Sequence, residues 1–197
     1  SLAKKGEGKV SPNPLVGAIV VKQGKIIAEG YHKGLGTPHA EVVAMEIAGN
    51  ESEGSDLYVN LEPCAHYGRT PPCVDAIIQR KISRVFISNK DPNPLVNGKS
   101  IKKLKDNNIQ VFTGILEDEG YFLNEIFFKY IQTGIPFIAL KSAASLDGKI
   151  STSNGESKWI TSEKSRKDAH KLRNKYDCIL TGINTIIEDD SILTCRI

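Results

Sequence analysis

Three residues with metal-binding side chains stand out in the first half of the 197-residue sequence. His39 and Cys73 each open a stretch of helical periodicity, and Cys64 follows a β-rich run and a proline. Zinc binds imidazole and thiolate ligands, and three protein ligands leave the fourth tetrahedral position for water, as in catalytic sites. We therefore expect a catalytic zinc ion at these three residues, with its water brought to a pKa of about 7. The start of a helix should also favour the thiolate of Cys73.

Glu41 follows His39 by two positions and is the expected catalytic residue. In zinc deaminases, a glutamate in the pattern His-x-Glu takes a proton from the zinc-bound water and returns it to a ring nitrogen and the departing amine. Two residues that are two positions apart do not share a face of a regular helix. Spacing alone therefore does not explain how Glu41 reaches the metal.

Two alternatives to a catalytic zinc site remain open. His66 is available as a fourth protein ligand, which would close the site and abolish hydrolysis. The chain would then be a non-catalytic, zinc-stabilised binding module. The deaminase signature also ends in Pro-Cys-x-x-Cys, whereas a longer insertion separates Cys64 from Cys73 here.

Helices alternate with short β-rich runs along the chain, which predicts a layered α/β domain with helices on both faces of its sheet. The breakers Gly134 and Pro136 predict a boundary, giving domains at 1–135 and 136–197. The second stretch is too short to bury a core and resembles the opening of another α/β domain. We expect strands at 16–21, 26–30, 56–61, 84–88, 109–113, 137–143 and 178–181, and helices at 39–48, 73–80, 99–106, 116–130 and 164–174.

Composition excludes several classes of protein. A hydrophobic content of 40% and a charged content of 25% are ordinary for globular domains. A net charge of +3 gives little support to nucleic-acid binding, and the apolar runs are too short for a membrane helix. Four cysteines are too few for a disulfide scaffold. We expect a cytoplasmic protein with no nucleic-acid or membrane partner.

An ordered series of motifs covers essentially the whole chain and resembles the bifunctional deaminase/reductase family of riboflavin biosynthesis. The resemblance implies a three-layer α/β/α cytidine-deaminase-like domain, followed by the start of a dihydrofolate-reductase-like domain. The motifs lie at 12–17 (PNPLVG), 29–32 (EGYH), 38–41 (PHAE), 61–73 (LEPCAHYGRTPPC), 91–94 (DPNP), 141–148 (KSAASLDG), 155–161 (GESKWIT), 189–190 (DD) and 193–196 (LTCR).

The resemblance also implies the two reactions. The first domain would remove an exocyclic amine from 2,5-diamino-6-ribosylamino-4(3H)-pyrimidinone 5′-phosphate and release ammonia. The second would use NADPH to reduce the ribosyl group to ribityl. The runner-up function is another deaminase of the same fold, acting on a nucleoside, guanine or a tRNA adenosine.

By motif, the resemblance assigns His39, Cys64 and Cys73 to zinc and the proton-donor role to Glu41. The deaminase substrate would meet a second set of residues, in which a guanidinium and a hydroxyl suit a phosphate. This set is Asn13, His66, Arg69, Thr70 and Asp91.

In the second stretch, the resemblance implies an NADPH site and a sugar-phosphate site. The family's reductase continues well beyond this sequence, so we expect a fragment with little or no reductase turnover. Homo-oligomers are common in this fold, and one is expected here. The NADPH residues would be Ala143, Trp159, Thr185 and Asp189, and the sugar-phosphate residues Ser157, Arg173, Leu193 and Arg196.

Overall fold

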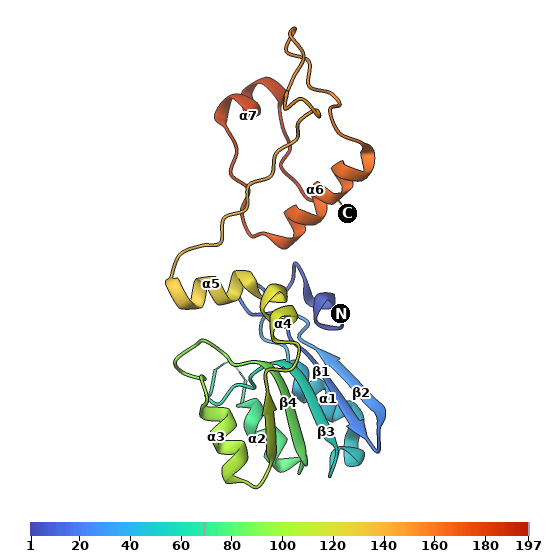
Figure 1. Cartoon of the computed structure of the whole chain (residues 1–197), viewed down its shortest axis with the longest axis vertical. Helices are drawn as coiled ribbons and strands as arrows, with labels where there is room; N and C mark the ends of the chain where they lie inside the picture. The colour runs from blue at the N-terminus through green and yellow to red at the C-terminus, as the bar shows by residue number, and fades with distance from the viewer. Residues whose placement is uncertain (69, 197) are drawn as a thin grey trace. The chain divides into compact units, whose positions relative to one another are not determined.

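The computed structural model describes residues 1–196 with the exception of position 69. The chain divides into two units, Ser1–Phe137 and Ile138–Ile197. The boundary expected after residue 135 lies two residues before this division. The first unit contains the sheet and the helices that pack against it (Figure 1).

Five strands form one mixed sheet in the order β2-β1-β3-β4-β5. The hairpin of β1 and β2 turns at Gln23 and Gly24, which both have positive φ, as a type I′ hairpin turn requires. β1 also pairs with β3 in antiparallel orientation, whereas β3, β4 and β5 are parallel. The strand bounds are β1 Gly17–Lys22, β2 Lys25–Tyr31, β3 Asp56–Leu61, β4 Arg84–Asn89 and β5 Gln110–Thr113.

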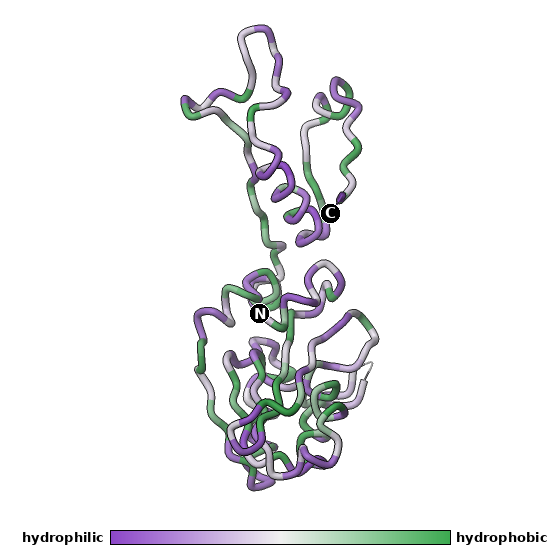
Figure 2. Tube along the Cα trace, turned by 90° about the vertical axis from the view of Figure 1, so that its right-hand side faces the viewer, coloured by the Kyte–Doolittle hydropathy of each residue, from purple (hydrophilic) through white to green (hydrophobic). Residues whose placement is uncertain are grey.

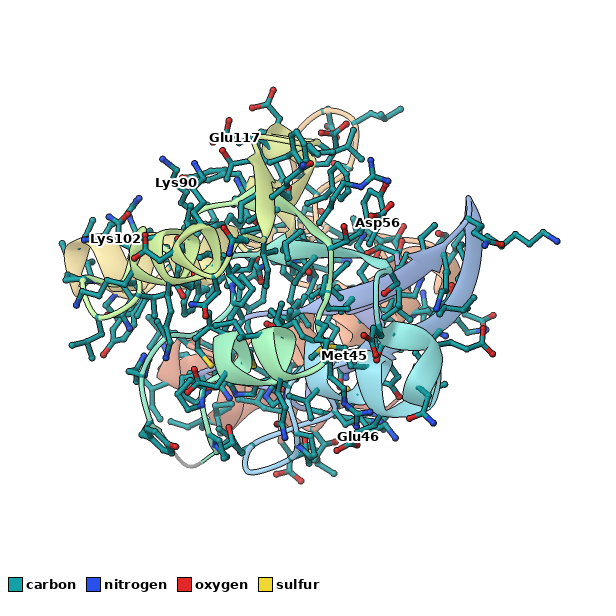
Figure 3. The ribbon with its side chains drawn as sticks, turned by 90° about the horizontal axis from the view of Figure 1, so that it is seen from below. Met45, Glu46, Asp56, Lys90, Lys102 and Glu117 are labelled. Atoms are coloured by element: carbon teal, nitrogen blue, oxygen red, sulfur yellow. The ribbon has the colours of Figure 1, made fainter. Side chains whose placement is uncertain are left out.

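Three helices cover one face of this sheet: α1 Ala40–Ala48, α2 Cys73–Gln79 and α3 Lys99–Asp106 (Figure 1). Alternate strand residues such as Leu57 and Val85 are fully buried beneath them. On α1, Met45 lies between the helix and the sheet, whereas the next residue, Glu46, lies on the outer side (Figure 3). The hydrophobic core of the unit therefore lies between this helical layer and the sheet.

The opposite face of the sheet carries a row of aromatic rings. Tyr58, Phe86 and Phe112 occupy paired positions on β3, β4 and β5 and stack at centroid distances of 4.4 and 4.9 Å. Helix α4, Glu117–Leu123, contacts the end of β4, where Gly120 packs against Ser88 and Asn89. The expected α/β class is confirmed, with the α1, α2 and α3 layer on one face and α4 at the strand end.

The single helix expected over 116–130 is wrong, because two helices occupy this region. Helix α4 ends at Leu123, and α5 spans Glu125–Thr133. Between them, Asn124 leaves the helical conformation, and its side chain bonds both the N–H and the carbonyl of Leu15, at 2.7 and 3.0 Å. These two hydrogen bonds join residues that are 109 positions apart, so periodicity along the sequence does not reveal them.

The second unit contains two helices, α6 Glu163–Lys175 and α7 Ile183–Asp189. α6 matches expectation and is capped by Ser162, whereas α7 was not predicted. The strands expected at 137–143 and 178–181 are wrong: these segments pair with no strand among the described residues. Leu140 and Leu180 are 95% and 100% exposed, and Figure 2 shows the hydrophobic stretch that enters this unit as an extended trace. Extended backbone becomes a strand only when a neighbour completes its hydrogen bonds.

Two 3-10 helices, η1 Ala3–Gly6 and η2 Gly49–Ser52, complete the regular structure. None of the described helices has both the length and the apolar character that a membrane crossing requires.

Candidate metal centre and its pocket

The three predicted metal ligands lie together at the ends of β3, α1 and α2. One ligand atom from each of His39, Cys64 and Cys73 falls within 4.8 Å of the others. The Nδ1 atom of His39 lies 3.0 Å from Cys73 Sγ and 3.5 Å from Cys64 Sγ. His66 is not a member of this cluster. Among the residues that the structure describes, the donor set is therefore one imidazole and two thiols.

The local backbone explains how His39 and Glu41 serve one site. His39 is the N-cap of α1 and has extended φ and ψ of −71° and 160°, so it precedes the helix rather than belonging to it. Glu41 lies in the first turn of α1. Because one of the two residues is outside the helix, the rule that positions two apart diverge does not apply.

Glu41 is buried beside the metal ligands. Its side chain is 3% exposed, and its Oε2 atom has no hydrogen-bond partner among the described residues. Burial, followed by the charge of Cys64, raises the pKa of this carboxyl to about 6. An unpartnered buried oxygen is costly unless a ligand or water completes it. The orphaned oxygen and the nitrogen and sulfur donors beside it fit a zinc ion with an exchangeable position.

Each of the two cysteines influences the pKa of the other. Hydrogen bonds from the Cys73 side chain, from His39 and from the backbone N–H of Cys73 at 3.2 Å lower the pKa of Cys64 to about 4. The thiolate of Cys64 in turn raises the pKa of Cys73. The first N–H of α2 also donates to Cys64, so the start of this helix stabilises the Cys64 thiolate, and its expected effect on the Cys73 thiolate stays a prediction.

A pocket of about 440 Å³ opens onto this cluster. His39, Glu41 and Cys64 line it, which leaves the metal side of the pocket accessible to a small molecule. Arg69 lies outside the described residues. The other residues expected to contact the deaminase substrate also line the pocket, namely Asn13, His66, Thr70 and Asp91.

Sequence reasoning missed the residue that positions Asp91. Glu62 is 3% exposed and accepts hydrogen bonds from Ser100 Oγ at 2.6 Å, Gly98 N at 3.1 Å and Asp91 N at 3.3 Å. Asp91 in turn accepts from Asn93 N at 2.8 Å, and burial raises its pKa to about 6. The signal for Glu62 was its place in the motif at 61–73.

His32 is a second residue that sequence reasoning did not assign, although it closes the motif at 29–32. It is 3% exposed, lines the pocket, and lies 5.4 Å from the His39 ring in an edge-to-face contact. Thr37, Asn93 and Phe127 also line the pocket without having been singled out, although Asn93 belongs to the motif at 91–94.

In the second unit, the two arginines expected at a sugar-phosphate site meet at one residue. Arg173 Nη1 donates to the Thr194 carbonyl at 2.9 Å, and Arg196 Nη1 donates to Thr194 Oγ1 at 3.0 Å. Trp159 is 70% exposed, and the Arg166 guanidinium lies 4.4 Å from its ring centroid. The remaining predicted residues are Thr185 and Asp189 on α7, and Ala143, Ser157 and Leu193 outside any helix or strand.

Comparison with protein families divides the chain in two. Residues 1–89 match the model for the cytidine and deoxycytidylate deaminase zinc-binding region. Residues 136–197 match the model for the RibD C-terminal domain. The first match includes His39, Glu41, Cys64 and Cys73.

Individual proteins match the chain over its whole length. The riboflavin biosynthesis protein RibD of Aquifex aeolicus is 55% identical over 100% of this chain and 55% of its own length. The structure of Acinetobacter baumannii RibD is 47% identical with a TM-score of 0.94, over 99% of this chain and 55% of that one. A Thermotoga maritima structure, described as a diaminohydroxyphosphoribosylaminopyrimidine deaminase and 5-amino-6-(5-phosphoribosylamino)uracil reductase, is 49% identical with a TM-score of 0.93, over 99% and 56%.

The chain spans about half the length of the curated relatives that it matches. Within that span, the two family regions and the identity over the full chain indicate the same family. The chain therefore belongs to the family of the riboflavin biosynthesis protein RibD.

Proposed function

We propose that the first unit is a zinc-dependent hydrolase that deaminates 2,5-diamino-6-ribosylamino-4(3H)-pyrimidinone 5′-phosphate. The observation that carries this proposal is the buried, unpartnered Oε2 atom of Glu41 beside the cluster of His39, Cys64 and Cys73. When bound to this donor set, zinc supplies a Lewis acid that brings the pKa of water to about 7. The relatives' printed names supply the substrate class.

Glu41 carries the proton in this reaction. Deamination consumes one water, replaces the exocyclic C–NH₂ by a carbonyl and releases ammonia. Glu41 takes a proton from the attacking water and passes it to a ring nitrogen. It then takes the second proton, from the hydroxyl now bound to the carbon, and gives it to the departing amine as the carbonyl forms and the C–N bond breaks. A carboxyl with a pKa of about 6 suits both directions of transfer near neutral pH.

The pocket residues bind the rest of the substrate. His66, whose buried Nδ1 atom has no hydrogen-bond partner among the described residues, and Thr70 offer donors to the ribose phosphate, together with Arg69. Asn13 and Asp91 contact the pyrimidinone base of the substrate. Each of these assignments predicts that loss of the side chain raises KM more than it lowers kcat.

A purely structural zinc site is less well supported. Such a site needs four protein ligands, and the cluster offers three. The pocket lined by His39 and Cys64 gives a small molecule access to the fourth position. For a tRNA-directed deaminase, the near-balanced charge of the chain gives little support.

The second unit is proposed to contribute to an NADPH-dependent reductase. Ala143, Trp159, Thr185 and Asp189 would belong to the cofactor site. The meeting of two arginines at Thr194 supports a sugar-phosphate site that includes Ser157, Arg173, Leu193 and Arg196. We further propose that the protein acts in the cytoplasm as a homo-oligomer, on a small phosphorylated pyrimidine rather than on nucleic acid or membrane.

The substitution Glu41→Gln tests the deaminase proposal. We expect ammonia release from the phosphorylated diaminopyrimidine to fall by about 10³-fold, because the amide cannot accept the proton. Zinc content, measured by elemental analysis of the purified protein, should stay at one ion per chain, since Glu41 is not a ligand.

Glu46→Gln is the matched control, because Glu46 lies on the same helix but is exposed. It should retain full activity. Full activity of the Glu41→Gln variant, or loss of its zinc, would contradict the assigned role.

A further inference from the structure

One buried side chain in the pocket wall has no role in the mechanism above. His32 is 3% exposed and lies at the end of β2, between the segment that carries Asn13 and the one that carries His39. Its backbone N–H donates to the Val16 carbonyl at 2.9 Å, which fixes it against β1. A buried imidazole held in this way can orient its neighbours.

The two ring nitrogens of His32 meet partners of different kinds. Nδ1 lies 3.4 Å from the Pro38 carbonyl, and a carbonyl can only accept a hydrogen bond. Nδ1 therefore carries the proton. In the neutral ring, Nε2 then has only a lone pair to offer. The atom that faces Nε2 is an amide nitrogen, which can only donate a hydrogen bond, and this agrees with the neutral form of the ring.

The partner of Nε2 is the side chain of Asn13. The Nδ2 atom of Asn13 lies 3.0 Å from it, which makes the asparagine NH₂ group the donor. An amide has two ends, and fixing one fixes the other. With Nδ2 turned to His32, Oδ1 is the end of the Asn13 amide that remains to meet a ligand in the pocket.

We propose that His32 is a positioning residue that locks the Asn13 amide, so that the pocket presents an acceptor oxygen to an N–H donor of the pyrimidinone. This inference rests on the proposed deaminase function. It specifies that the site offers a hydrogen-bond acceptor, rather than a donor, to the base of its substrate. An aminopyrimidinone carries ring and exocyclic N–H groups, whereas a base that offers only an acceptor at that position would face the Asn13 oxygen and lose affinity.

Two matched variants at position 32 separate the two hydrogen bonds of His32. In His32→Asn, the shorter amide reaches the Pro38 carbonyl but not Asn13. In His32→Gln, the longer side chain places its oxygen near the Nε2 position and can accept from Asn13. Both replacements are polar amides, so burial of the polar group is matched between them.

The experiment measures KM and kcat for ammonia release from the phosphorylated diaminopyrimidine, together with zinc content. We expect His32→Asn to raise KM about tenfold, as for a lost hydrogen bond in a buried site, with kcat changed less than about threefold. His32→Gln should keep KM within about threefold of the wild type. Both variants should keep one zinc ion per chain.

A double-mutant cycle with Asn13→Ala completes the test. If His32 acts through Asn13, the Asn13→Ala change should raise KM about as much as His32→Asn, and adding His32→Asn to it should change KM no further. Equal KM for His32→Asn and His32→Gln, additive effects in the cycle, or loss of zinc would each overturn the inference. Wild-type protein that releases no ammonia would overturn the proposed function itself, and this inference with it.

Discussion

The two units of the chain carry motifs of similar length but build them into very different surroundings. In the first unit, Glu41, Glu62 and His32 are each 3% exposed and are surrounded by a sheet and three helices. In the second, none of the described residues at 138–196 is buried, and Trp159 is 70% exposed. The residues of the motif at 193–196 meet α6 through exposed hydrogen bonds, such as that of Arg173 with the Thr194 carbonyl.

This difference shows what makes a motif into a site. In the first unit, Glu62 holds three donors from the segment at 91–100, so Asp91 has one position relative to the metal ligands. Buried hydrogen bonds of this kind are expensive to break, and they keep a side chain in place. An exposed arginine or tryptophan has no comparable restraint.

The largest effect that sharpens the comparison comes from one leucine in each unit. Leu57 is fully buried and Leu180 is fully exposed. We expect Leu57→Ala to lower the free energy of unfolding by about 2–5 kcal/mol, because it leaves a cavity in the core. Leu180→Ala should change it by less than about 0.5 kcal/mol. Urea unfolding followed by circular dichroism measures both, and equal losses would contradict the contrast between the units.

A smaller effect is expected from a pair of serines. Ser100→Ala removes one of the three donors to the buried carboxylate of Glu62 and should cost about 1–3 kcal/mol of unfolding free energy. Ser162→Ala removes the cap of α6, which has no buried residue, so only local fraying of that helix should follow. A shift of the main unfolding midpoint by Ser162→Ala, as large as that caused by Ser100→Ala, would show that the second unit is coupled to the core.

The last expected effect concerns pH. Burial raises the pKa of Asp91 from 3.8 to about 6, so the folded protein binds this proton more tightly than the unfolded chain does. The stability contributed by protonated Asp91 is present below about pH 4 and is lost as pH rises through about 6. Asp91→Asn should therefore gain stability relative to the wild type between pH 4.5 and pH 7.5, as measured by urea unfolding at both values.

Asp168 provides the comparison in the second unit. It is exposed, and the hydrogen bond with Lys171 lowers its pKa. Solvent screens such a pair, so Asp168→Asn should leave the pH dependence of unfolding unchanged. If the stability difference between Asp91→Asn and the wild type is the same at both pH values, Asp91 is not the source of the pH dependence.

Much of the first unit follows from local sequence patterns. Periodicity and breakers predicted the strand at Asp56–Leu61 and the helix at Lys99–Asp106 with the observed bounds. Residue chemistry predicted the three-ligand cluster, and the structure confirms its proximity. These features depend on residues near one another in the chain, or on side chains whose chemistry is distinctive by itself.

The remaining features depend on contacts between distant residues, and only the tertiary structure decided them. Asn124 separates two helices and bonds Leu15, 109 positions away. The N-cap position of His39, the burial of Glu41 and the meeting of His32 with Asn13 likewise arise when packed elements exclude water and leave polar groups to find particular partners. Periodicity reports which face of an element is apolar, but not which buried polar group meets which.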